Sequence, residues 1–363
     1  MVRLTHLKPT HLKPTHFTWV ALLLVLGHIL NFNNIAHSQN LADPPPAYPV
    51  APPPPGTDPL PSERDSYQQQ TLSPDYRISS LYRDRQGFLW AGSWQGVARL
   101  NPNTGQVVTV VNLPNAIVGA LAEDRSGRLW VGTDDGIKRV DVNTGEITAQ
   151  NFTLPSNRTL SLAVDHRGYL WVGSDRGLAL ISPDQGLLMT TVKNLPGVSA
   201  NALSLDQQGN LWVGTLEGLV RVDTASAYIT GTIPQLPGQM VQVLRADRFH
   251  SLWIGTPAGL HVLDTRTGQI YRSVNSMAGR SITSLSFDQD LDRLWVGTDS
   301  GLFLINPYNG AIENQIVDLP SGQILALSPN TGNKLWIGTG EGLAWLGSSP
   351  VPARQHFILP PTP

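Results

Sequence analysis

The residues best placed to bind a ligand stand in seven pairs, each directly before a glycine that recurs along the chain. The pairs differ in chemistry although their surroundings are alike, and variation on a fixed scaffold is where recognition usually resides. The pairs are Trp94-Gln95, Asp134-Asp135, Asp175-Arg176, Leu216-Glu217, Pro257-Ala258, Asp299-Ser300 and Gly340-Glu341. They hold six acids and one arginine.

If these pairs surround one opening, their carboxylates suit a cation, a basic peptide or a sugar. Asp and Glu before Gly are also good hairpin residues, and this alternative stays open for each carboxylate. Trp94 is the only tryptophan in such a pair, so its indole is expected either to offer a stacking surface or to pack on its neighbour. Arg77, Arg158 and Arg280 lie in the connections between repeats and are expected on the same rim.

The histidines offer no catalytic pairing. His166 and His250 stand in predicted turns, His261 lies inside a predicted strand and His356 is near the C-terminus. The sequence has no cysteine, which excludes disulfides and thiolate metal sites. It also lacks a Gly-rich phosphate loop and the motifs H-E-x-x-H and G-x-S-x-G. We therefore expect no catalytic residue, no metal and no cofactor.

The seven pairs belong to a repeat that occurs seven times, as in GNLWVGTLEGLVRV at 209–222. Its tryptophans are 40 to 42 residues apart: Trp90, Trp130, Trp171, Trp212, Trp253, Trp295 and Trp336. Four short strands in about 40 residues are typical of a propeller blade. The sequence therefore predicts an all-β fold, a seven-bladed β-propeller with four antiparallel strands per blade.

Each repeat contains two kinds of tight turn. In the D-x-x-G turn, Asp caps its own backbone and Gly takes the positive φ; a second turn, such as residues 141–145, precedes the fourth strand. Both turns are expected on one rim of the propeller, which we interpret as structural because it hardly changes between repeats. The variable pairs and the connections between repeats are expected on the other rim, where propellers usually bind ligands.

The L-W-V-G-T strand predicts how neighbouring blades pack. Leu and Val should fill one layer between blades and Trp the other. The Gly two places after Trp shares its face by strand alternation. A side chain at Gly214, for example, is expected to collide with the neighbouring blade.

Residues 1–38 carry a basic start, an apolar run at 17–30 and the small-x-small site Ala36 to Ser38, which together predict a signal peptide. An uncleaved anchor is the alternative, because residues 31–35 could lengthen the apolar run. Residues 39–65 form a proline-rich linker, with ten prolines at 43–62, and favour a stiff spacer. The propeller is expected over 66–359, its last blade completed by 66–72 or by 354–359, with a slight preference for the first.

The net charge gives no reason to expect a nucleic-acid partner. The chain has 25 Lys and Arg against 27 Asp and Glu, for a net charge of −2. Contact with a membrane is expected only if the N-terminal segment stays uncleaved.

The unit D-x-x-G-x-L-W-V-G-T-x-x-G-L, in seven near-complete copies over 78–346, resembles the two-component regulator propeller repeat of extracytoplasmic bacterial sensors. The resemblance implies a seven-bladed propeller. In larger members of the family, paired propellers sense glycans or other ligands and signal through a membrane helix to a histidine kinase. Because these 363 residues hold one propeller and no kinase, we expect a sensing or binding module without its own output.

The expected function is that of a non-catalytic extracytoplasmic propeller, periplasmic or secreted. It would bind a protein, a small molecule or a glycan at its mouth and act with a separate membrane sensor kinase. The alternative is a propeller lyase or hydrolase of the streptogramin-lyase type, since those propellers share G-x-L-W blades.

Overall fold

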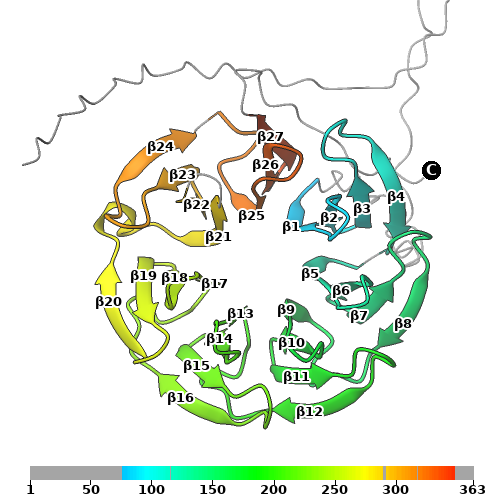
Figure 1. The fold of residues 1–363 in the computed structure, drawn as a ribbon, viewed down its shortest axis with the longest axis horizontal. Helices are drawn as coiled ribbons and strands as arrows, with labels where there is room; N and C mark the ends of the chain where they lie inside the picture. Colours follow the sequence, from blue (N-terminus) through cyan, green and yellow to red (C-terminus); the bar gives the residue numbers. More distant parts are fainter. Residues whose placement is uncertain (1–75, 115, 289–291, 317, 348–363) are drawn as a thin grey trace, which may run out of the picture. The chain divides into compact units, whose positions relative to one another are not determined.

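The structure, a computed structural model, describes residues 76–114, 116–288, 292–316 and 318–347. These residues form seven antiparallel sheets that stand in a ring around a common axis (Figure 1). Six sheets have four strands, and the seventh shows three within the described residues. The chain is therefore the seven-bladed β-propeller that the repeat predicts.

The blades follow one another in chain order. Within each blade the first strand lies nearest the axis, and the later strands lie successively farther from it (Figure 1). Blades 1 to 3 comprise β1 (Ile78–Arg83), β2 (Leu89–Ser93), β3 (Gly96–Leu100) and β4 (Val107–Asn112); β5 (Val118–Glu123), β6 (Leu129–Thr133), β7 (Gly136–Val140) and β8 (Ile147–Asn151); and β9 (Thr159–Val164), β10 (Leu170–Ser174), β11 (Gly177–Ile181) and β12 (Leu188–Val192). Blades 4 and 5 comprise β13 (Ala202–Leu205), β14 (Leu211–Thr215), β15 (Gly218–Val222) and β16 (Ile229–Ile233); and β17 (Val243–Ala246), β18 (Ser251–Thr256), β19 (Gly259–Asp264) and β20 (Gln269–Ser273), which the short 3₁₀ helix η3 (Asn275–Met277) follows. Blades 6 and 7 comprise β21 (Ile282–Asp288), β22 (Arg293–Thr298), β23 (Leu302–Ile305) and β24 (Ile312–Ile316); and β25 (Ile324–Ser328), β26 (Lys334–Thr339) and β27 (Gly342–Gly347).

This strand order gives the propeller two rims. The turns from first to second strand and from third to fourth strand lie on one rim, which we call the turn rim. The hairpins from second to third strand and the connections between blades lie on the other, which we call the tip rim.

Several predicted segments fall outside the described residues. These are the signal peptide or anchor at 1–38, the linker at 39–65, and both candidates for the last outer strand, 66–72 and 354–359. Within residues 76–347, apart from the gaps in that range, no helix is both long and apolar enough to span a membrane.

The predicted packing between blades is confirmed. Seven clusters of buried side chains fill the seven contacts between neighbouring blades. In one of them Trp212 of blade 4 packs with Leu252 and Ile254 of blade 5. In another, Trp336 of blade 7 packs with Leu89 of blade 1, so hydrophobic contact joins the last blade to the first.

The aspartate of the D-x-x-G turn links the turn to the core. In blade 4, Asp206 accepts the backbone N–H of Asn210 at 2.9 Å through Oδ1 and the indole N–H of Trp212 at 2.9 Å through Oδ2. The equivalent indole bonds in the other four of blades 1 to 5 join Trp90 to Asp84, Trp130 to Asp124, Trp171 to Asp165 and Trp253 to Asp247. Blade 7 differs, because Trp336 donates to the carbonyl of Thr331 at 3.0 Å.

Basic side chains on the turn rim join neighbouring blades. Arg99 of blade 1 donates to the carbonyl of Val142 in blade 2 at 3.2 Å, and Arg139 of blade 2 donates to that of Asp184 in blade 3 at 2.7 Å. Lys334 of blade 7 reaches the carbonyl of Pro102 in blade 1 at 2.6 Å. A hydrogen bond from a charged donor is stronger than one between neutral groups, so these contacts hold the turns of adjacent blades together.

The expected collision at Gly214 is also confirmed. A Cβ built on this residue would lie 2.8 Å from Cβ of Val241, a buried residue at the entry to blade 5. The corresponding glycine in every other blade also faces the entry of the following blade. Blade spacing therefore depends on the absence of a side chain at this position.

Replacing Gly214 with valine should lower the free energy of unfolding by about 1–3 kcal/mol, because the added methyl groups overpack the contact with blade 5. Urea denaturation of the two proteins measures the change. Gly231→Val on the outer strand β16 is the matched control, since a Cβ there meets nothing closer than 3.8 Å. Equal losses in the two variants would contradict the packing described for blade 4.

Candidate functional site

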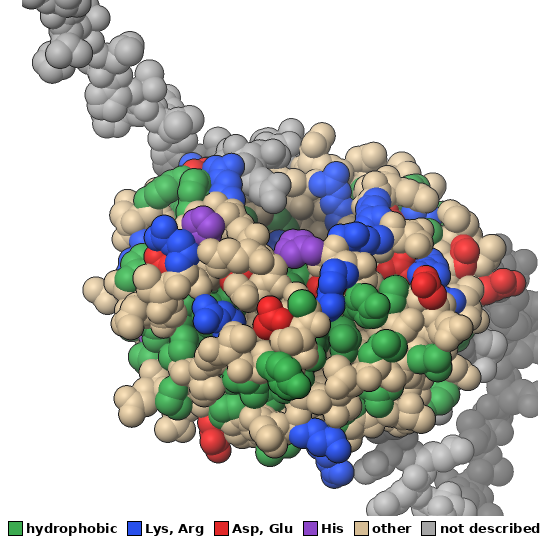
Figure 2. Space-filling view, turned by 60° about the horizontal axis from the view of Figure 1, so that its bottom comes forward, with side chains coloured by type: hydrophobic (Ala, Val, Ile, Leu, Met, Phe, Trp, Pro, Cys, Tyr) green, Lys and Arg blue, Asp and Glu red, His purple; other side chains and the backbone are tan. Residues whose placement is uncertain are grey.

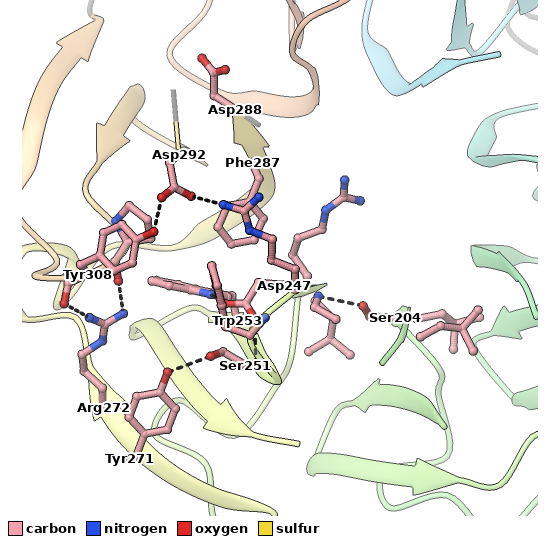
Figure 3. Close-up of a pocket in the computed structure, with 18 of the residues that line it drawn as sticks. Ser204, Asp247, Ser251, Trp253, Tyr271, Arg272, Phe287, Asp288, Asp292 and Tyr308 are labelled. Carbon is pink, nitrogen blue, oxygen red and sulfur yellow. Dashed lines mark hydrogen bonds and ion pairs between the residues drawn. The ribbon is translucent and has the colours of Figure 1, made fainter. Parts of the chain in front are cut away.

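A cavity of about 840 Å³ opens on the turn rim at blades 4 to 6. Its walls come from the inner strands β13, β17 and β21 and from the turns of blades 5 and 6 (Figure 3). Pockets that bind small molecules typically have volumes of about 300–1,000 Å³. Lys, Arg and His side chains gather around a hollow on the face of the propeller in Figure 2.

Beside the cavity, a different strand supplies the arginine that lies over the blade tryptophan. In blades 1, 2 and 4 an arginine of the third strand pairs with the tryptophan position and lies over its ring; these are Arg99, Arg139 and Arg221. Blade 5 has Val262 at this position. Arg272 of the outer strand covers Trp253 instead, with its guanidinium 5.0 Å from the ring centre.

The first turn of blade 5 also departs from D-x-x-G. His250 takes the glycine position with φ of 63°, in the left-handed region that is uncommon for residues other than glycine. Asp247 still accepts the backbone N–H groups of Phe249 at 2.7 Å and Ser251 at 2.9 Å, and the indole N–H of Trp253 at 3.2 Å. The turn is therefore held in place while its side chains differ from those of the other blades.

Aromatic side chains form much of the cavity wall. Phe249, Tyr271 and Tyr308 line it and are 57%, 56% and 63% exposed. Deeper in the cavity, Trp253 meets Phe287 edge to face, with ring centres 6.0 Å apart. Exposed rings that share one concave surface provide faces on which a flat ligand can stack.

A polar network crosses the same wall (Figure 3). Asp292 lies 3.4 Å from Arg248 and accepts the hydroxyl of Tyr308, and this hydrogen bond raises the pKa of Tyr308. Arg272 donates to the carbonyls of Pro307 at 2.6 Å and Tyr308 at 2.8 Å, which joins blade 5 to blade 6.

Two serines of the lining form hydrogen bonds within the protein. Ser251 shares a hydrogen bond of 3.0 Å with the Tyr271 hydroxyl, and Ser204 accepts the backbone N–H of Ala246 at 3.0 Å. Neither serine is paired with a histidine. In the part of the chain that the structure describes, no group of three or more His, Asp or Glu is arranged to hold a metal ion.

The residues that the sequence singled out lie around the tip rim. Asp134 accepts the backbone N–H of Ile117 at 2.8 Å, so this carboxylate holds the connection between blades, as the hairpin alternative allows. Trp94 is half-buried rather than fully exposed, and Arg280 lies over the ring of Phe303 at 4.6 Å. The remaining candidates are the half-buried Gln95 and Asp175 and the exposed Asp135, Arg176, Glu217, Asp299, Glu341, Arg77 and Arg158. That these residues bind one ligand stays a prediction.

The sequence interpretation of the turn rim as purely structural missed the cavity. A signal was present in the departures of 247–251 and 288–293 from the D-x-x-G pattern and in the valine at 262. The histidines are placed as expected: His166 and His250 lie in turns, while His261 is buried inside β19. His356 lies outside the described residues.

Four segments of the repeat region match a known protein family. The family described as Two component regulator propeller matches residues 72–95, 112–135, 153–176 and 194–217. These segments include the second strands of blades 1 to 4. No curated protein sequence matches this chain.

Solved structures share the fold. The extracellular domain of BT4673 from B. thetaiotaomicron, assigned to a hybrid two component system, matches with a TM-score of 0.64 and 20% identity over 77% of this chain and 41% of that one. The extracellular domain of BT3049 from the same organism, assigned to the same kind of system, matches with a TM-score of 0.63 and 20% identity over 77% and 41%. This chain thus spans about two fifths of the length of the solved structures it matches.

Acid should destabilise the propeller through His261. Nδ1 of this residue lies 2.9 Å from Oγ of Ser273, Nε2 has no partner in the described residues, and burial lowers the pKa of the ring from its usual 6.5. Below about pH 6.5 the unfolded chain takes up a proton here that the folded chain does not. The free energy of unfolding should therefore fall as the pH falls from 7 to 5.

Thermal unfolding at several pH values measures this effect. Because His261→Gln removes the titrating ring, its melting temperature should fall less with acid than that of the wild-type chain. Parallel pH profiles for the two proteins would contradict the role of His261.

Proposed function

We propose that this chain, a propeller of two-component regulator repeats, is an extracytoplasmic sensing module that binds its ligand without catalysis. The observation that carries the proposal is the cavity on the turn rim, where Phe249, Tyr271 and Tyr308 are exposed together beside charged side chains. In the other blades the same rim is occupied largely by turn and blade-to-blade contacts. A surface that departs from the repeat, and there becomes concave and aromatic, suits ligand binding.

The proposed location rests on two supports. The similar solved structures are described as extracellular domains of two component systems, and the N-terminal residues have the pattern of a signal peptide or anchor. A periplasmic or secreted propeller of this kind would pass its signal to a separate protein, and a membrane sensor kinase is the partner we propose.

The tip rim is a second candidate surface. There Oδ1 of Asp175 and the indole nitrogen of Trp94 are buried without hydrogen-bond partners in the described residues. Buried polar atoms are usually paired, so a protein partner or a ligand at this rim could supply the missing bonds. We propose the predicted set around Trp94 as this second surface.

A propeller lyase or hydrolase is less well supported. His261 is buried and bonded to Ser273, which keeps it from acting as an accessible general base. Any hydrolase or lyase activity of the purified chain that depends on His261 and Glu217 would favour this alternative.

The proposed function is tested by thermal shift of the full chain against a panel of sugars, sugar acids, amino acids and aromatic acids. At least one class should raise the melting temperature of the wild-type chain, because a ligand that binds only the folded state stabilises it. Phe249→Ala should abolish the shift, since it removes an exposed ring of the cavity and leaves the backbone amide that Asp247 accepts.

Trp94→Ala on the tip rim is the matched control and should keep the shift. Loss of the shift in Trp94→Ala but not in Phe249→Ala would move the binding site to the tip rim. A panel in which no compound changes the melting temperature would count against a small-molecule site in the cavity.

A further inference from the structure

Arg245 on β17 is a charged residue that the repeat does not explain. It occupies the inner-strand position paired with the blade tryptophan. The other blades carry uncharged residues there: Tyr82, Ala122, Ala163, Ser204, Ser286 and Ser328. Arg245 is thus the only charged side chain at this position in the ring, and it lines the cavity.

The other two arginines of the cavity have partners. Arg248 lies 3.4 Å from Asp292, and Arg272 donates to the carbonyl oxygens of Pro307 and Tyr308. Arg248 therefore has an ion-pair partner, and two nitrogens of Arg272 are bonded to blade 6, while Nε of Arg272 is buried without a partner in the described residues.

The cavity aspartates are also engaged. Asp247 accepts two turn amides and an indole N–H, and Asp288 accepts the side-chain amide of Asn330 at 3.2 Å. Asp292 accepts the Tyr308 hydroxyl besides facing Arg248.

Arg245 differs from all of these groups. It is exposed, and its side chain makes no hydrogen bond or ion pair with any residue that the structure describes. A guanidinium group has five N–H donors in a planar fork that matches a carboxylate. The cavity thus presents a guanidinium group without a side-chain partner, and the exposed rings of Phe249, Tyr271 and Tyr308 line the same cavity.

We propose that the cavity binds a ligand with one carboxylate and a flat ring, the carboxylate meeting Arg245 and the ring stacking on Phe249 or Tyr308. This inference rests on the proposed function and deepens it by giving the ligand class. A single guanidinium balances a single negative charge, so a monoanion fits better than a phosphate monoester, which carries nearly two charges. The apolar faces of the rings favour a flat body over a purely polar one.

The test compares two probes that differ only in charge, 4-hydroxyphenylacetate and 4-hydroxyphenylacetamide. Ligand-observed NMR titration of the full chain should show that the carboxylate binds about tenfold more tightly or better than the amide, because a hydrogen bond between charged partners is the stronger one. The affinity of the carboxylate, but not of the amide, should fall as salt rises from about 0.05 to about 0.5 M.

Two variants assign the preference to Arg245. Arg245→Met removes the charge and keeps a long apolar stem, so it should bind both probes with the weak affinity of the amide. Arg245→Lys keeps the charge and should keep a clear preference for the carboxylate. The melting temperature of each variant without ligand checks that the fold is intact.

Equal affinity of the wild-type chain for the two probes, no binding of either, or an unchanged preference in Arg245→Met would overturn the inference. Binding of neutral compounds that is at least as tight as binding of the carboxylate, and that is lost in Phe249→Ala, would also overturn it, while leaving the cavity as the binding site of the proposed function.

Discussion

In blades 1 to 5, one aspartate carboxylate links the tight turn of the blade to the tryptophan that packs on the next blade. In blades 1 to 5 the first aspartate of the turn binds a backbone amide of that turn and the indole N–H of the tryptophan that packs on the next blade. A buried donor left without a partner costs more than a typical hydrogen bond contributes. The aspartate therefore fixes the turn, the ring of the tryptophan and, through that ring, the spacing between blades.

This link explains how one part of the turn rim can change without loss of the fold. Blade 5 has His250 where glycine is usual and Val262 where blades 1, 2 and 4 have arginine, yet Asp247 keeps both kinds of hydrogen bond. The four segments that match the family come from blades 1 to 4, whose turns keep Asp-x-x-Gly. The turns that line the cavity belong to blades 5 and 6, so the cavity lies where the turn pattern is relaxed, and blade 5 still retains the carboxylate bond.

Much of the fold could be predicted from the sequence, because spacing and alternation are local properties. The 40 to 42 residue period gave seven blades, and strand alternation placed Gly214 against the next blade. The cavity could not be predicted in the same way, since its walls combine residues from Ala163 to Tyr308 that are far apart in the sequence. The variable pairs, such as Trp94-Gln95, are visible when the repeats are compared in sequence. That the Arg245 side chain has no partner is visible only in the structure.

The role of the carboxylate is tested most directly by Asp206→Asn in blade 4. The variant can still accept a turn amide through one oxygen, but its NH₂ group would face the indole N–H of Trp212. Urea unfolding should show a loss of about 2 kcal/mol, while Asp223→Asn, in an exposed turn of the same blade, should change the free energy of unfolding by less than about 0.5 kcal/mol. Equal, small effects of both substitutions would contradict the central place given to this hydrogen bond.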